Sequence, residues 1–192
     1  MKATHSLVFL VLGAALVSIS SADVIPTLSS TTPIGSSFTW NYSTNVTVDQ
    51  MVQPGDFFTV YDFGNFTPGS NMQPANWTFS SALTGKNPSL VTVTDNPALL
   101  NLTWVYNGAS AINGSALLGM FSVVTNTDQL RTADFAAEAT RSSGPNAGTK
   151  IDNVGTISVP VPEVPTFLPV LGVCGVALVT SLFSYRRRCK AT

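Results

Sequence analysis

Apolar and polar side chains alternate along much of the chain between residues 38 and 124. In the clearest run, over residues 38–48, polar residues separate a row of apolar ones that only Thr44 interrupts: Phe38, Trp40, Tyr42, Val46 and Val48. A period of two residues is typical of a β-strand with one buried face. The run therefore predicts a half-buried strand.

Shorter runs repeat this alternation, at residues 76–80, 91–94 and 101–106. Two further stretches, residues 57–63 and 117–124, are rich in β-forming residues but apolar on both faces. The first predicts a central strand. The second predicts another strand, with Gly119 as a bulge or a point of close backbone contact.

Residues 131–140 contain four alanines and fit a strand and a short helix equally well, whereas residues 142–153 are predicted to form a loop. Turn-forming residues separate the runs, at Pro54-Gly55, Pro68-Gly69, Gly85, Asn96-Pro97, Asn107-Gly108 and Asn113-Gly114. Short strands with frequent turns predict an all-β fold, a β-sandwich or jelly-roll-like exported domain over residues 23–159.

The N-terminal residues 1–22 have the three parts of a secretory signal peptide. Lys2 supplies a basic start, residues 7–19 are apolar, and small residues lead to a predicted cleavage between Ala22 and Asp23. The apolar run is shorter than the roughly 20 residues that span a bilayer. An uncleaved N-terminal anchor is therefore the less favoured alternative.

A second apolar segment, residues 167–185, contains no charged residue. A helix of that length spans about 28 Å, close to the hydrocarbon thickness of about 30 Å, so we expect one transmembrane helix. Residues 186–192 begin with three arginines and are predicted to stay on the cytoplasmic side. Residues 160–166, with three prolines, predict a stiff extended stalk before the membrane.

Charge and composition limit the chemistry of the outer domain. Between Asp23 and Pro162 the sequence has nine acidic and four basic residues, a net charge of −5, which argues against nucleic-acid binding. The one histidine, His5, lies in the signal peptide, and both cysteines, Cys174 and Cys189, lie in the C-terminal tail. We therefore predict a domain without disulfides, cofactor, metal site or catalytic residues.

Only weak candidates for chemistry remain. Asp134 and Glu138 are four residues apart and would share a face as an acid–base pair if their segment were helical. Asp56 and Asp62 flank an aromatic run and are weak candidates for calcium ligands, without the spacing of a calcium-binding loop. For Asp134 and Glu138, solvated surface carboxylates are the favoured interpretation.

Six Asn-x-Ser/Thr triplets are candidate glycosylation sites, and they begin at Asn41, Asn45, Asn65, Asn76, Asn101 and Asn113. In five of the six the middle residue is apolar. A half-buried strand with Asn and Thr on its outer face produces that pattern by itself. The triplets therefore fit strand alternation better than glycan attachment, although asparagines on a polar face leave attachment open.

The C-terminal segment resembles the PEP-CTERM sorting signals of bacterial exported proteins. The resemblance consists of a Pro-Glu-Val-Pro motif, the apolar segment and the arginine cluster: Pro162, Glu163, Pro165, Arg186, Arg187 and Arg188. The strict motif lacks the inserted Val164. Residues 55–63 and 101–106 also resemble uncharacterised exported domains that carry such tails.

The resemblance implies an inner-membrane precursor that an exosortase, a transpeptidase-like enzyme, processes for delivery to the cell surface or extracellular matrix. The leading hypothesis is a non-enzymatic surface or matrix protein associated with exopolysaccharide or biofilm. One alternative is a carbohydrate-binding module that uses Trp40, Trp77 and Trp104, although alternation places these rings on inward faces. The other is a eukaryotic type I membrane glycoprotein.

Overall fold

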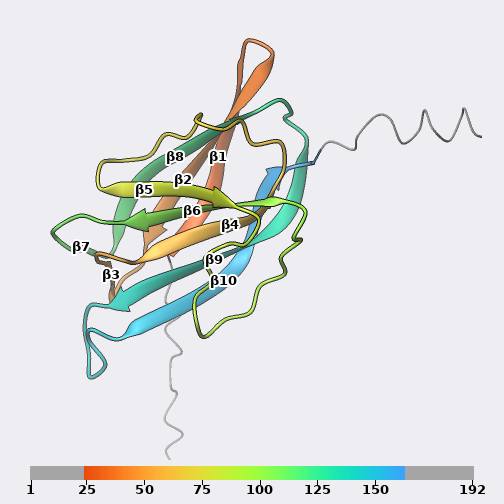
Figure 1. Cartoon of the computed structure of the whole chain (residues 1–192). Coiled ribbons are helices and arrows are strands. Elements are labelled where there is room, and N and C mark those ends of the chain that lie inside the picture. Colours follow the sequence, from red (N-terminus) through yellow and green to blue (C-terminus); the bar gives the residue numbers. More distant parts are fainter. Residues whose placement is uncertain (1–23, 163–192) are drawn as a thin grey trace, which may run out of the picture.

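The computed structural model describes residues 24–162, which form an all-β fold of two antiparallel sheets without any helix (Figure 1). In chain order the strands are β1 (Val24–Ile34), β2 (Ser37–Val46), β3 (Gln50–Val52), β4 (Phe57–Phe63), β5 (Trp77–Ala82), β6 (Leu100–Tyr106), β7 (Ile112–Asn113), β8 (Ala116–Thr125), β9 (Leu130–Arg141) and β10 (Lys150–Pro160). The predicted signal peptide and transmembrane helix lie outside the described residues.

The smaller sheet has the order β1-β2-β8, and the larger has the order β5-β6-β4-β9-β3-β7. Strand β10 pairs with β9 along its whole length, and β9 also pairs with β4 and then with β3. The turn between β3 and β4 therefore lies close to both long C-terminal strands. Within residues 24–162, no helix has the length and apolar character to cross a membrane.

The predicted alternation holds along β2. Trp40, Tyr42 and Val46 are buried, and Thr44 is buried on the same face, so the buried row continues across the polar residue. The prediction was wrong for Val48, which is 62% exposed, because β2 ends at Val46 and the chain turns before β3.

Aromatic side chains fill the space between the sheets. Phe58 of β4 stacks on Trp104 of β6, with ring centroids 5.0 Å apart, and meets Phe121 of β8 edge-on. Phe121 thus brings the smaller sheet into contact with the larger one. As predicted, β4 is a central strand, between β6 and β9. The close contact expected at Gly119 is also present, since a Cβ there would lie 2.4 Å from the Pro74 ring.

The structure decides or corrects the sequence predictions for three segments. Residues 131–140 belong to strand β9, so the helical alternative is wrong. The predicted loop over residues 142–153 is wrong from Lys150 onward, because β10 begins there and pairs residue by residue with β9. Residues 91–94 alternate as a strand does but form none, because they lie within a long connection that pairs with no sheet edge.

Candidate functional site

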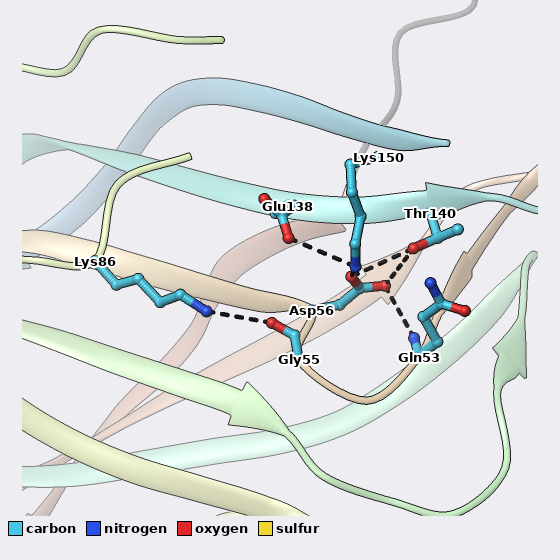
Figure 2. A network of polar contacts seen from close by, with 7 residues as sticks. All are labelled: Gln53, Gly55, Asp56, Lys86, Glu138, Thr140 and Lys150. Atoms are coloured by element: carbon cyan, nitrogen blue, oxygen red, sulfur yellow. Dashed lines mark hydrogen bonds and ion pairs between the residues drawn. The ribbon is translucent and has the colours of Figure 1, made fainter. Parts of the chain in front are cut away.

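Titratable side chains meet at the junction of β3, β4, β9 and β10 (Figure 2). The Asp56 carboxylate is fully buried at the start of β4 and forms an ion pair with the Lys150 ammonium. Its Oδ2 accepts hydrogen bonds from the Gln53 N–H, at 2.9 Å, and from the Thr140 hydroxyl, at 3.0 Å. Glu138 Oε1 lies 3.5 Å from the same Lys150 nitrogen.

Sheet register brings these groups together. Lys150 is the direct cross-strand partner of Thr140, and Glu138 is the partner of Phe57, the residue after Asp56. Thr140 and Glu138 are two residues apart on β9, so they share one face of the sheet. Asp56 is the residue immediately before β4, and the turn between β3 and β4 places it beside this face of the sheet.

A 17-residue connection, residues 83–99, crosses the outer face of the larger sheet, and we call it the strap. The Lys86 carbonyl accepts hydrogen bonds from the Thr59 and Tyr61 hydroxyls, at 2.7 and 3.0 Å. Farther along, strap N–H groups donate to the Asp152, Asp134 and Asp62 carboxylates. The strap thus covers the outer side of β4. Connections this long without regular structure are uncommon in compact domains.

The strap gives a first prediction. Replacing both Asp134 and Asp152 by alanine removes two acceptors for strap N–H groups, so amide hydrogen exchange at Leu90 and Thr94 is expected to accelerate. Both hydrogen bonds to the strap are exposed, so global stability should change by no more than about 1 kcal/mol. Site-resolved exchange measures both effects. Unchanged exchange at Leu90 and Thr94 would show that these carboxylates do not hold the strap.

The candidate acid–base pair, which depended on a helical segment, does not form on strand β9. Asp134 and Glu138 share a face of β9, but four residues of extended chain separate their Cα atoms by about 13 Å. Paired glycosidase carboxyl groups lie about 5–9.5 Å apart. Each carboxylate also has another partner, the Thr94 N–H for Asp134 and the Lys150 ammonium for Glu138.

The weak calcium candidates also lie apart, since Asp56 and Asp62 occur at opposite ends of β4. Asp62 accepts a hydrogen bond from the Asn96 N–H, and Asp56 is paired with Lys150. Within residues 24–162 no group of three or more His, Cys, Asp or Glu side chains is arranged to hold a metal ion.

The three tryptophans lie in the core, as alternation predicted. Trp40 and Trp104 are fully buried, and Trp77 is nearly so. Tyr42, Tyr61 and Tyr106 are buried as well, so the described domain exposes no Trp or Tyr ring for stacking on a sugar. This placement disfavours an aromatic sugar-binding platform.

The six candidate glycosylation residues differ in accessibility. Asn45, Asn76 and Asn113 are exposed, whereas Asn41 and Asn65 are half-buried. Asn101 is 1% exposed, and its side-chain N–H₂ group donates hydrogen bonds to the Leu83 carbonyl and the Asp95 carboxylate. A glycan on Asn101 would replace one of these N–H donors, and the buried side chain leaves no room for it in the folded domain.

Two open grooves lie elsewhere on the domain. One, of about 440 Å³, lies between the end of β2 and the start of β8, and one of about 220 Å³ separates β1 from β10. Neither is lined by a titratable side chain. The network around Asp56 lies outside both of these grooves.

Sequence reasoning missed Lys150, which it placed in a loop. The signal that could have found it is the apolar spacing of Ile151, Ile157 and Val159, which extends a strand back to that lysine. Of the predicted sorting motif, only Pro162 is among the described residues. Glu163, Pro165 and the three arginines, like the Ala22–Asp23 cleavage site, lie outside them.

Comparison with protein-family models, with curated proteins and with solved structures finds no match to this chain.

Proposed function

We propose that this chain is a non-enzymatic exported protein of the bacterial surface or extracellular matrix, associated with exopolysaccharide. In this proposal a signal peptide over residues 1–22 directs export, and a transmembrane helix over residues 167–185 holds the precursor in the inner membrane. An exosortase-like enzyme then processes the tail. The outer domain is the part of the chain that is delivered to the surface, and we propose that its two sheets are arranged as in a jelly roll.

The observation that carries the proposal is the order of features after the last strand. Strand β10 ends at Pro160, and the motif Pro-Glu-Val-Pro follows directly at residues 162–165. An uncharged segment of membrane-spanning length comes next, and then the arginine cluster. A permanent membrane anchor needs only the apolar segment and the basic residues that follow it. The proline-rich motif at the membrane boundary supplies an extended strand that a processing enzyme can bind.

The tail gives the second prediction. Protein recovered from its native cells should lack residues 186–192, with a new C-terminus near residues 163–166. Replacing Glu163 and Pro165 by alanine should leave membrane insertion intact, because neither residue lies in the apolar segment, but should prevent release. Intact-mass measurement of the released and membrane fractions tests this.

A Val161→Ala variant, which lies just before the Pro-Glu-Val-Pro motif, is the matched control, and it should be released like the wild type. Recovery of the full-length chain from the membrane, still ending at Thr192, would show instead that the tail is a permanent anchor. The same spectra test the glycoprotein alternative. Hexose-bearing masses on Asn45, Asn76 or Asn113 would favour a eukaryotic type I membrane protein instead.

A further inference from the structure

The network around Asp56 contains the groups that a spontaneous amide cross-link needs, which are an amine, a carboxyl group and a second carboxylate. The Lys150 amine contacts the carboxyl group of Asp56, which is fully buried, and the Glu138 carboxylate lies 3.5 Å from that amine (Figure 2). We propose that Lys150 and Asp56 join in an intramolecular amide bond between Nζ and Cγ, with Glu138 as the catalytic residue that moves the protons. The cross-link is independent of how the tail is processed.

The surroundings of Asp56 favour an amide over an ion pair. A buried charge has a large desolvation cost, and an amide removes both charges of the pair at once. The Gln53 N–H and the Thr140 hydroxyl both donate to Oδ2, so they are placed to stabilise negative charge that develops on this oxygen. The Lys150 amine approaches the other oxygen, Oδ1.

The reaction balances without any oxidant or cofactor. Proton transfer from the ammonium to the carboxylate first gives a neutral amine and a carboxylic acid. The Nζ lone pair of Lys150 then attacks Cγ of Asp56, and the C=O electron pair moves onto Oδ2. Glu138 accepts a proton from Nζ and returns it to the Oδ1 hydroxyl, which leaves as water when the C=O bond re-forms. One N–C bond forms, one C–O bond breaks and one water is released.

Only one of the two nearby lysines has this arrangement. The Lys86 amine donates to the Gly55 carbonyl at 3.2 Å and lies over the Phe57 ring, and it pairs with no carboxylate of residues 24–162. The amine of Lys150, by contrast, lies between two carboxyl groups, Asp56 and Glu138. This difference makes Lys86 an internal control.

The position of the bond suits an exported domain. Asp56 and Lys150 are 94 positions apart, so the amide would close most of the described chain into one covalent loop. Closing a long loop restricts the unfolded chain, as a disulfide does. The described residues contain no cysteine, so no disulfide can supply this restriction. The bond would tie the β3–β4 turn to β10, the last strand before the tail.

Peptide mapping of the full chain by mass spectrometry, after denaturation and trypsin digestion, tests the proposal. The expected result is one joined fragment that contains both Asp56 and Lys150, is lighter than its two parts by one water, and is uncleaved after Lys150. Separate fragments of full mass, cleaved after Lys150, would overturn the cross-link and leave an ion pair only.

Matched variants assign the roles. Lys150→Arg should abolish the joined fragment, and Lys86→Arg should keep it. Asp56→Asn should give the same joined fragment as the wild type, with loss of ammonia in place of water. Glu138→Gln should leave the fragments separate in a folded protein, whereas Asp134→Asn, on the same face of β9, should keep them joined. A joined fragment in Glu138→Gln at the wild-type yield would overturn the role of Glu138.

Discussion

Replacing Trp104 by alanine is expected to lower the free energy of unfolding by roughly 3–5 kcal/mol, the usual cost of a large-to-small change at a buried aromatic residue. Trp104 is fully buried and contacts three other rings, Phe58, Phe79 and Phe121. These rings come from both sheets, so the cavity would open where the sheets meet. Chemical denaturation of the two proteins measures the difference.

Conservative replacements separate ring packing from hydrogen bonding. The Trp104 indole N–H has no hydrogen-bond partner in the described structure, whereas that of Trp40 donates to the Thr125 hydroxyl and the Thr127 carbonyl. Trp40→Phe should therefore cost about 1 kcal/mol more than Trp104→Phe, because it removes the hydrogen bonds of the Trp40 indole N–H, whereas Trp104→Phe removes none. A loss below about 1 kcal/mol for Trp104→Ala would show that the sheets do not pack around this ring.

Alternation along the chain predicted the core well, because burial on one face of a strand is a local property. Trp40, Trp77 and Trp104 are all inward, and each lies in a run of period two. The same reasoning failed at Val91 and Val93, which alternate without forming a strand. Alternation reports which side chains can share a face, but a strand also needs a neighbouring edge with which to pair.

The network around Asp56 could not be predicted from spacing. Asp56, Glu138 and Lys150 are far apart in sequence, and they meet only because β9 pairs with both β4 and β10. The sequence ranked Asp56 as a weak metal candidate and Glu138 as half of an acid–base pair. Neither prediction included the lysine, because its strand was assigned to a loop.

Buried tyrosines give the last prediction, a loss of stability in alkali. Burial raises the pKa of Tyr42 well above its usual range. Burial, with the nearby charges of Asp95 and Asp134, raises the pKa of Tyr61 to about 12. In the unfolded chain both hydroxyls release their protons near pH 10. Between about pH 10 and 12 the unfolded state therefore binds fewer protons than the folded state, so the free energy of unfolding falls as the pH rises.

For Tyr61 the rise of the pKa from about 10 to about 12 corresponds to at most about 2.7 kcal/mol in the free energy of unfolding. Urea unfolding from pH 9 to 12 should show the decrease in the wild type. The Tyr42→Phe, Tyr61→Phe double variant keeps both rings and every other group of the wild type, so it is the reference. Its stability should decrease less with pH than that of the wild type, even though it lacks the hydrogen bonds to the Ser158 and Lys86 carbonyls. If the free energy of unfolding fell equally steeply with pH in the two proteins, neither tyrosine hydroxyl would keep its proton in the folded state above pH 10.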